Sequence, residues 1–586
     1  MITSIDDIHR IEAAGEAAWM PHTGIAQALS AAAAQFGSRP ALRCLDPLAP
    51  DGWGASWTHA QLVADIARTA GWFNAISGAQ AARVGLLSPP TAEAWLALWG
   101  AEWRGCAVPI NHALRDAHLI ALLQAAELDV LVVHADPEAG GLAPDAVRRI
   151  AAALPPRCRI VVTHGDLDIA LPFAQRHQGP TLPPIDAPSS GPVALYHTGG
   201  TTGLPKLAQH TARNQLFAAK GAAAAYDARP EDVILNGFPL FHVAGAIVYG
   251  LSMLTSGASI ALPPPGGWRN PDFVQHAWRL IDQQGISVLG MVPTVMAMLL
   301  QAPGAEAAHH GVRLGLTGGS PLPTGVADAF ERQTGIPVRN ILGMTETSGV
   351  IAIEVASAPR TPGSCGLPVP FCQVRRDARG EVVVQGPNVS PGYTDAARNP
   401  GTFEGDGLHT GDLGHLDAQG RLFVTGRAKD VIIRGAHNID PNTIEEVLCQ
   451  HPQVAAAAAI GLPDAHAGEV PVAYIQWSGT TPHDEAEVLA WARTRISEAA
   501  AVPKFIRAMA ALPQTAIGKI YKPELRRLAT QALFEQLLTQ NGIAAEVQAH
   551  DQGGQLQLRF QASQEAARDA VGGLMQAYAL DWCWQD

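Results

Sequence analysis

A run of hydroxyl and glycine residues behind a short apolar segment is the first stretch that could do chemistry. Residues 193–196 read as a buried strand, and the loop after them contains Thr198, Gly199, Gly200, Thr201, Thr202, Gly203 and Lys206. Glycines let backbone N–H groups approach an oxyanion, while the hydroxyls add donors and the lysine adds a positive charge. The stretch predicts a polyphosphate-binding loop, although its spacing is not that of a Walker loop. An ordinary surface turn is the less favoured alternative.

Two later loops also combine glycine with hydroxyl residues. The segments T-G-G-S-P-L-P at 317–323 and L-G-M-T-E-T at 342–347 each follow an apolar strand. Loops that follow parallel strands open at one edge of a sheet, so we expect both beside the phosphate loop. Glu346 in the second loop is a candidate Mg²⁺ ligand, because Mg²⁺ prefers one or two carboxylates together with phosphate oxygens and water.

His242 lies in the segment F-P-L-F-H-V-A-G, between a proline turn and a helix rich in glycine and alanine. A lone histidine is usually structural. This position also suits the wall of a pocket for an apolar ligand. The two interpretations are about equally supported by the segment alone.

Seven motifs in order resemble those of the acyl-CoA synthetases in the adenylate-forming, or AMP-binding, superfamily. They are the phosphate loop, P-L-F-H-V-A-G, T-G-G-S-P-L-P, L-G-M-T-E-T, H-T-G-D-L-G-H-L, G-R-A-K-D and P-Q-T-A-I-G-K-I-Y-K, and they fall within residues 20–530. The resemblance implies an AMP-forming acid–thiol ligase that uses ATP, Mg²⁺ and coenzyme A. Its partners would be these small molecules and a carboxylic acid.

The resemblance also implies roles for individual residues. Lys519 would be the catalytic lysine, acting with Lys206 and Glu346, while Thr198 and Glu346 would hold Mg²⁺. Asp412 and Arg427 would bind the ribose. The other implied nucleotide and coenzyme A contacts are the phosphate-loop residues with Gly319, Ser320, Pro321, Leu342, Gly343, Met344, Thr345, Gly435 and Ala436. The implied acid-binding residues are His242, Val243, Ala244, Gly245 and Gly343.

Several positions depart from the family pattern. Gly199 replaces a usual serine, Leu207 a glycine, Leu342 an aromatic residue and Ala436 a glycine. Two alternatives to an acyl-CoA synthetase therefore stay open: a catalytically degenerate nucleotide-binding module, and an enzyme that loads a carrier protein. Against the second, no carrier domain follows, and His242 stands where amino-acid-activating relatives have an aspartate.

The expected substrate follows from the same comparison. Acetate-specific relatives have a tryptophan where Gly343 stands, and Ala244, Gly245 and Gly250 are further small residues. We expect room for a medium-chain or long-chain fatty acid or an aromatic acid. The sequence does not choose between aliphatic and aromatic acids.

The elements that must position these residues alternate between helices and strands. Helices are predicted over 23–36, 58–76, 90–105 and 114–126, and strands over 82–87 and 129–133. Such alternation predicts an α/β fold, with parallel sheets covered by helices. Residues 168–191 are rich in proline and polar residues and are interpreted as a linker. After residue 373, matching turns at 377–380 and 417–420 predict a small barrel-like subdomain.

Three units are expected along the chain. Residues 1–428 form the large AMP-binding domain, and residues 429–530 form a smaller, mobile α+β domain that follows a hinge at Lys429, as the resemblance implies. Residues 541–586 form an appended α/β module, with strands near 546–549, 555–560 and 580–584 and a helix near 563–578.

Composition excludes several other classes of protein. The chain has 586 residues, a net charge of -13 and no cluster of basic residues, which argues against nucleic-acid binding. Residues 236–268 carry no charge before Arg269, but prolines and glycines interrupt them, so a buried helix and strand are expected rather than a membrane span. Seven scattered cysteines and an acidic N-terminus without an export signal predict a reduced, cytoplasmic protein.

Overall fold

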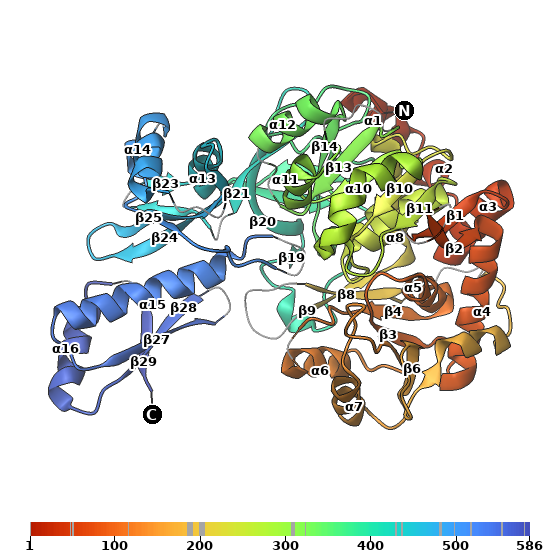
Figure 1. Cartoon of the computed structure of the whole chain (residues 1–586), viewed down its shortest axis with the longest axis horizontal. Coiled ribbons are helices and arrows are strands. Elements are labelled where there is room, and N and C mark those ends of the chain that lie inside the picture. Colours follow the sequence, from red (N-terminus) through yellow and green to blue (C-terminus); the bar gives the residue numbers. More distant parts are fainter. Residues whose placement is uncertain are drawn as a thin grey trace.

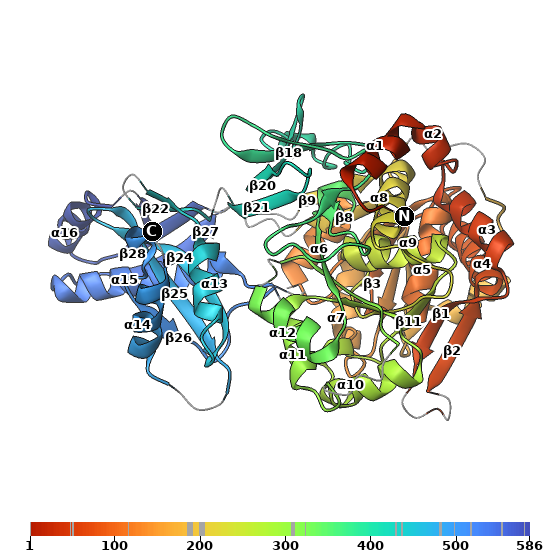
Figure 2. The ribbon, with the colours of Figure 1, turned by 90° about the horizontal axis from the view of Figure 1, so that it is seen from above.

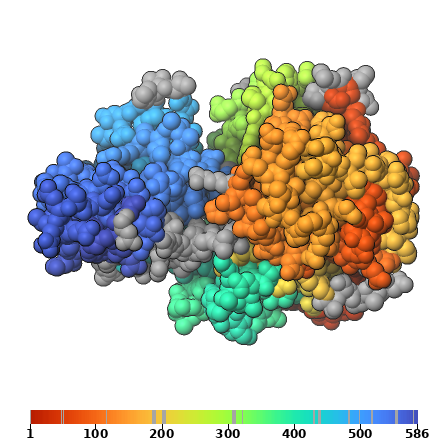
Figure 3. Space-filling model, turned by 90° about the horizontal axis from the view of Figure 1, so that it is seen from below, coloured from red at the N-terminus to blue at the C-terminus, as the bar shows by residue number. Residues whose placement is uncertain are grey.

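The computed structural model describes residues 2–585 except 47–48, 50–51, 115, 185–190, 199–205, 306–310, 321, 323, 428–429, 435–436, 480–482, 497, 516–518, 553–554 and 579. The chain forms a large N-terminal domain and a smaller C-terminal part, which lie side by side (Figure 1). The space-filling view shows the same two bodies from another side (Figure 3). The α/β fold class and the division into a large and a smaller domain are confirmed.

One sheet of the large domain has seven strands in the order β7-β6-β5-β3-β4-β8-β9. Its strands are parallel except for the β8–β9 pair. Apolar runs such as V-L-V-V in β5 are buried along their whole length, as strands covered on both faces require. The bounds are β3 Arg83–Leu87, β4 Cys106–Pro109, β5 Val130–His134, β6 Arg159–His164, β7 Leu171–Pro172, β8 Ala194–Thr198 and β9 Lys206–His210.

A second sheet has nine strands in the order β16-β15-β14-β13-β12-β10-β11-β1-β2. Its centre is parallel, and its two edges are closed by the antiparallel pairs β1–β2, β14–β15 and β15–β16. The bounds are β1 Pro40–Leu45, β2 Trp53–Thr58, β10 Val233–Asn236, β11 Ser259–Leu262, β12 Val288–Met291, β13 Leu314–Gly318, β14 Val338–Leu342, β15 Ala352–Ile353 and β16 Leu367–Pro368.

Helices α4, α5, α8 and η2 share one hydrophobic core with strands of both sheets. Helix α5 shows why: its sequence A-E-A-W-L-A-L-W-G-A-E-W-R is apolar on almost every side, and Trp95 and Trp99 are fully buried. The α-helices are α1 Ile5–Ala13, α2 Glu16–Trp19, α3 Ile25–Phe36, α4 His59–Ser77, α5 Ala92–Arg104, α6 Asp116–Ala125, α7 Pro144–Ala152, α8 Ala212–Ala225, α9 Ser252–Thr255, α10 Pro271–Gln283, α11 Pro293–Gln301 and α12 Thr324–Thr334. The π-helix is η2 Ala244–Leu251, and the 3₁₀ turns are η1 Phe173–Gln178, η3 Gly267–Arg269, η4 Thr345–Thr347 and η5 Ala396–Arg398.

A five-stranded antiparallel subdomain follows and projects from one side of the large domain (Figure 2). Its strands are β17 Gln373–Arg376, β18 Glu381–Gln385, β19 Phe403–Glu404, β20 Gly407–Leu416 and β21 Leu422–Arg427. The matching turns are present as predicted, because Asp377 accepts the backbone N–H groups of residues 379 and 381 and Asp417 accepts those of 419 and 421.

The smaller C-terminal domain contains a sheet in the order β23-β22-β25-β24, with β26 beside β25. Its elements are β22 Ile432–Arg434, β23 His437–Ile439, α13 Pro441–Cys449, β24 Val454–Asp464, β25 Gly468–Trp477, α14 Glu485–Arg495, η6 Ala499–Ala501 and β26 Ile506–Ala508. The long pair β24–β25 forms the centre of this domain, with α13 packed against β24.

The last residues form what we name the C-terminal module: β27 Glu546–Gln552, β28 Gln555–Gln561, α16 Glu565–Met575 and β29 Asp581–Trp584. These elements lie where the sequence predicted them. Helix α15 Lys522–Gln540 is shared, because Leu525 and Ala529 pack on the smaller domain while Phe534 and Leu538 are buried in the core of the module. The module is therefore joined to the smaller domain by a continuous helix.

Two expectations about the large domain are wrong. Residues 168–191 are not only a linker, since they contain β7 and η1, and Phe173 is buried against Trp72 and Phe73 with ring centroids 6.0 and 6.4 Å apart. The three chemical loops also do not share one sheet edge: the phosphate loop joins β8 to β9 in the seven-stranded sheet, whereas the other two follow β13 and β14 in the nine-stranded sheet. Among the described helices, none has the length and apolarity to cross a bilayer.

Candidate active site

The two sheets of the large domain meet at the turn that contains Glu346. Turn η4, which follows β14, contacts β8 and β9. The Nε2 atom of His210 on β9 lies 2.7 Å from the backbone oxygen of Thr345, and it must be the donor because a carbonyl can only accept. Burial lowers the pKa of His210 to about 4, so the imidazole is neutral. This bond fixes one flank of the phosphate loop to the turn that contains Glu346.

Glu346 is buried, and its Oε1 atom accepts a hydrogen bond from the Tyr393 hydroxyl at 2.6 Å. The Nζ atom of Lys206 lies 4.6 Å from the centre of the Tyr393 ring, within the range of a cation–π contact. Burial first, and then the Glu346 carboxylate, raises the pKa of Tyr393 above its ordinary value. Tyr393 therefore contacts both charged residues that the sequence singled out.

Sequence reasoning missed Tyr393 and His210. Each contacts a residue distant in sequence: Tyr393 is 47 residues from Glu346, and His210 is 135 residues from Thr345. Neither lies in a pattern with a recognisable spacing. Only a residue-level comparison of loops in space could have connected them.

Asp412 and Arg427 face each other on the paired strands β20 and β21. The Nε atom of Arg427 donates to Oδ1 of Asp412 at 3.0 Å. Burial raises the pKa of Asp412, and the positive charges of Arg427 and Lys519 oppose that rise. The two predicted ribose ligands are thus adjacent, and the charge of Lys519 from the smaller domain helps to lower the pKa of Asp412.

In the smaller domain, the backbone N–H of Thr515 donates to the backbone oxygen of Lys519 at 2.7 Å, and the backbone N–H of Lys519 donates to the Thr515 hydroxyl at 3.2 Å. Burial and then Arg427 lower the pKa of Lys519 to about 8, while Asp412 and Asp430 raise it. Lys519 also helps to lower the pKa of His242. The charge of Lys519 is therefore within electrostatic range of Asp412, Arg427 and His242.

His242 and His197 both have neutral imidazole rings. The backbone N–H of Ala244 donates to Nδ1 of His242 at 3.2 Å, and the backbone N–H of Asn111 donates to Nε2 of His197 at 3.1 Å. Each ring therefore accepts at one nitrogen and carries its proton on the other. Burial lowers the pKa of each to about 4. Phe241 stacks on His197, with ring centroids 5.8 Å apart.

Val243 follows His242 in the chain, and Ala244 is the first residue of the π-helix η2. A π-helix is an unusual element that often marks functional sites. The glycines expected to leave space there are closely packed instead. A Cβ atom at Gly343 would lie 2.0 Å from the backbone oxygen of Gly349, and one at Gly245 would lie 2.7 Å from that of Pro239. At Gly250 it would meet Gly245 and Trp95. These glycines allow close backbone packing, so the sequence argument that they enlarge the acid pocket is wrong.

The remaining predicted contacts divide into two groups. Leu342 and Met344 are half-buried against the core of the large domain, and Gly319, with φ +81°, and Ser320 follow β13. Thr198 ends β8, paired in register with Lys206. Gly199, Gly200, Thr201, Thr202, Gly203, Pro321, Lys429, Gly435 and Ala436 lie outside the described residues.

Comparison with known proteins identifies the family. Residues 29–394 match the AMP-binding enzyme family, and residues 443–519 match the AMP-binding enzyme C-terminal domain. The chain belongs to the AMP-binding enzyme family. Both matched ranges end before the C-terminal module of this AMP-binding enzyme.

Individual relatives are CoA ligases. The chain is 31% identical to marinolic acid–CoA ligase of Pseudoalteromonas sp. over 90% of this chain and 84% of the relative. It is 32% identical to sulfoacetate–CoA ligase of Cupriavidus necator over 86% and 97%. The structure of O-succinylbenzoate coenzyme A synthetase of Bacillus subtilis, in complex with ATP and a magnesium ion, has a TM-score of 0.70 and 26% identity over 86% of this chain and 98% of that one.

This AMP-binding enzyme is accordingly an AMP-forming acid–CoA ligase that acts through an acyl-adenylate. Its substrates are a small-molecule carboxylic acid, ATP and coenzyme A, and it uses Mg²⁺. The carboxylate of Glu346 is buried, on a turn in contact with the strand that ends at Thr198, and it is a hard oxygen donor of the kind that Mg²⁺ prefers.

Proposed function

We propose that this ligase activates an apolar carboxylic acid, either a medium-chain or long-chain fatty acid or an aromatic acid. The observation that carries the proposal is His242, which is uncharged, half-buried and 6.2 Å from the ring of Phe238, itself packed on Tyr249. A neutral imidazole beside aromatic rings suits an apolar acid. It offers no negative charge for the ammonium group of an amino acid.

We assign the following roles at the site. Lys206 and Lys519 would neutralise charge on the phosphates, and Asp412 with Arg427 would hold the ribose. Thr198 and Glu346 would hold Mg²⁺, which when bound shields the phosphate oxygens. Two observations support these roles: Tyr393 contacts both Glu346 and Lys206, and the charge of Lys519 helps to lower the pKa of Asp412 and of His242.

We further propose that the domain of residues 429–530 turns about Lys429 between the two half-reactions. Lys519 faces the large domain in the described arrangement. The loop at Gly435 and Ala436, which the family resemblance links to coenzyme A, belongs to the same domain. One orientation would serve adenylation and a second would serve thioester formation.

The substrate proposal is tested by a panel of acids in a pyrophosphate-release assay. We expect kcat/KM for octanoate or benzoate to exceed that for acetate by about tenfold or more, because each buried methylene adds about 0.8 kcal/mol. Amino acids of similar size serve as the matched control and should be poor substrates. Preference for acetate, or for an amino acid, would contradict the proposal.

Two alternatives make different predictions in one assay. An enzyme that loads a carrier protein would form the adenylate but release little AMP when coenzyme A is added. A catalytically degenerate module would bind ATP without releasing pyrophosphate. AMP release that depends on coenzyme A, with a measured thioester product, supports the ligase.

The C-terminal module should be dispensable for chemistry, because every motif lies before it. A chain ending at Gln540 would expose Phe534 and Leu538, so we expect it to aggregate or to melt at a lower temperature. The same truncation with Phe534→Gln and Leu538→Gln should be soluble and should form acyl-adenylate at the rate of the full chain. Loss of adenylation in this folded, soluble variant would show that the module takes part in the reaction.

A further inference from the structure

The strand that contains Asp412 is irregular at this residue. Glu381 of β18 pairs with Leu413 of β20, and Val383 pairs with His409, so residues 410–412 of β20 stand opposite Val382 alone. Such a bulge removes the regular ladder bonds. Gly411 has φ +75°, a conformation that favours glycine. Asp412 still pairs with Arg427 of β21 on its other side, but on the β18 side the backbone around Asp412 must be held by other groups.

Side chains replace the missing ladder bonds. The hydroxyl of Thr410 donates to the backbone oxygen of Val382 at 2.8 Å and accepts from the backbone N–H of Asp412 at 3.1 Å. The Oε1 atom of Glu381 accepts from the backbone N–H of Gly411 at 2.8 Å. Glu381 and Thr410 thus hold the Asp412 backbone on the side that faces β18.

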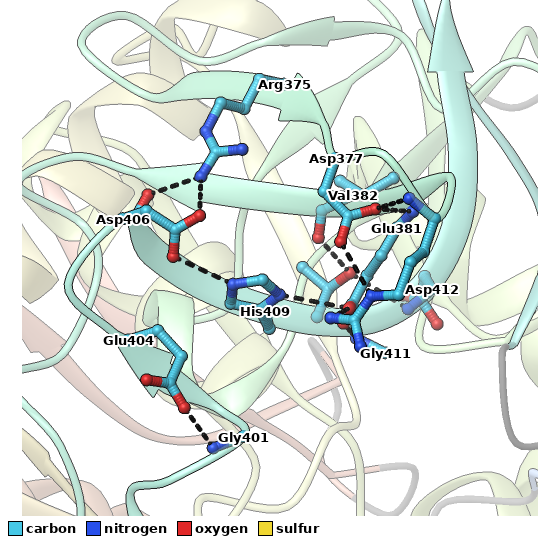
Figure 4. A network of polar contacts seen from close by, with 12 residues as sticks. Arg375, Asp377, Glu381, Val382, Gly401, Glu404, Asp406, His409, Gly411 and Asp412 are labelled. Carbon is cyan, nitrogen blue, oxygen red and sulfur yellow. Dashed lines mark hydrogen bonds and ion pairs between the residues drawn. The ribbon is translucent and has the colours of Figure 1, made fainter.

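His409 holds Glu381 in turn (Figure 4). Its Nδ1 atom lies 3.1 Å from Oε2 of Glu381, and its Nε2 atom lies 3.1 Å from Oδ1 of Asp406. Carboxylate oxygens accept hydrogen bonds, so both ring nitrogens must donate, and only the imidazolium has two N–H donors. The side chain of His409 is 10% exposed, so a charged ring is held between two acids in a largely buried position.

The surrounding charges complete a network on three strands. Arg375 of β17 donates to the backbone oxygen of Asp406 at 2.9 Å and pairs with its carboxylate. In the turn between β17 and β18, Asp377 accepts backbone N–H groups, and Arg379 lies 3.5 Å from Glu381. Oxygens of Asp377 and Glu381 and a nitrogen of His409 lie within 4.8 Å of one another. The protein's own donors already engage these atoms, which favours a positioning network over a cation site.

We propose that His409, as an imidazolium, is a positioning residue for ATP binding: it orients Glu381, which holds the Gly411 N–H and so sets the position of Asp412. This inference rests on the proposed role of Asp412 as a ribose ligand. The chain of contacts is Asp406, His409, Glu381, Gly411 and Asp412, and each link is a described hydrogen bond or a peptide bond.

The network should make ATP binding depend on pH. Asp406 first, and then Glu381, raise the pKa of His409 above 6.5, against the effect of burial. The charged ring and both of its hydrogen bonds are present below that raised pKa. As pH rises through it, the ring loses one donor, Glu381 loses an anchor, and the Asp412 backbone is less well fixed.

The test measures ATP binding by calorimetry in a Lys519→Ala background, which removes turnover and the titration of Lys519. We expect the Kd for MgATP to weaken about tenfold between about pH 6 and about pH 9, the loss that one hydrogen bond to a charged group implies. Adding His409→Gln should weaken binding about tenfold already at the lower pH and abolish the pH dependence. His415→Gln is the matched control on the same strand, where an exposed histidine stacks on Phe423.

A double-mutant cycle tests the route through Glu381. Glu381→Ala should weaken binding as much as His409→Gln, and the double variant should be no weaker than either. Additive losses would overturn the proposed route. Melting temperatures within a few degrees of the parent would exclude a general loss of folding.

Two further outcomes distinguish a failure of the positioning role of His409 from a failure of the ribose role of Asp412. If Asp412→Ala left ATP binding unchanged, the proposed ribose role would fail; if Asp412→Ala weakened binding while His409→Gln did not, only the inference about His409 would fail. A rise in melting temperature with micromolar Zn²⁺ that His409→Gln abolishes would identify a cation site and would overturn the positioning role.

Discussion

Replacing Lys519 with alanine should lower the rate of acyl-adenylate formation by a factor of about 10² to 10³, or about 3 to 4 kcal/mol, as for loss of other preorganised transition-state donors. Lys519 is the charge that the smaller domain brings to Asp412, Arg427 and His242. The same variant should still transfer the acyl group of a chemically supplied acyl-adenylate to coenzyme A. Pyrophosphate release and thioester formation, measured separately, check the two halves.

Lys429→Pro provides the opposite case. Proline fixes φ near -65° and stiffens the backbone at the proposed hinge, so thioester formation should slow while adenylation persists. If each substitution slowed both steps equally, the division of labour between the lysine and the hinge would be wrong.

The pH dependence of adenylation should report the protonation of Lys519. Burial lowers the pKa of Lys519 from 10.5 to about 8. The ammonium group is therefore present below about pH 8 and is lost as the pH rises through that value. We expect kcat/KM for ATP in adenylation to fall above this pH, because kcat/KM reports groups of the free enzyme. A profile that stayed flat to pH 10 would contradict a charged role for Lys519.

Replacing Glu346 with glutamine should lower kcat/KM for adenylation by about 100-fold, because it removes a buried negative charge proposed to hold Mg²⁺ beside the phosphates. The amide oxygen can still accept from the Tyr393 hydroxyl, so the turn at η4 should keep its structure. The Mg²⁺ concentration that gives half-maximal rate should rise as well. Titrating MgCl₂ at fixed ATP measures that shift.

Tyr393→Phe is the matched control for Glu346→Gln. It removes the hydroxyl at 2.6 Å from Glu346 but leaves the carboxylate and the aromatic ring under Lys206. We expect about a tenfold loss or less, since one hydrogen bond to a charged group contributes about 1.5 to 3 kcal/mol and water can replace part of it. An equal loss in both variants would mean that Glu346 acts mainly through its contact with Tyr393.

The sequence predicted the elements with strong periodicity well. Helices α3, α4 and α5 and strands β3 and β5 lie within a few residues of their expected bounds, because apolar periodicity and capping act locally. Helix α4, for example, begins at a Thr58 cap and ends at Gly78 with φ +74°. Strand β7, at Leu171–Pro172, was missed because two residues carry no periodic signal.

The arrangement of the strands was not predictable in the same way. Nothing in the strands β8, β13 and β14 distinguishes one sheet from another, since pairing depends on contacts far apart in the chain. Gly343 illustrates the same limit for the site: the absent side chain was taken as open space, but the Gly349 backbone fills it. The motifs identified which residues belong to the site, and only the fold shows what surrounds them.

Helix α15 gives the C-terminal module a mechanical relation to the smaller domain. Its 19 residues extend over about 28 Å at 1.5 Å per residue, and its two halves are buried in different cores. A module held in this way would act as a lever arm: the proposed turn of the smaller domain would produce a larger displacement at the far end of the chain. A fluorophore attached beyond Trp584, paired with a second on the large domain, would therefore report the domain rotation in real time during a single turnover.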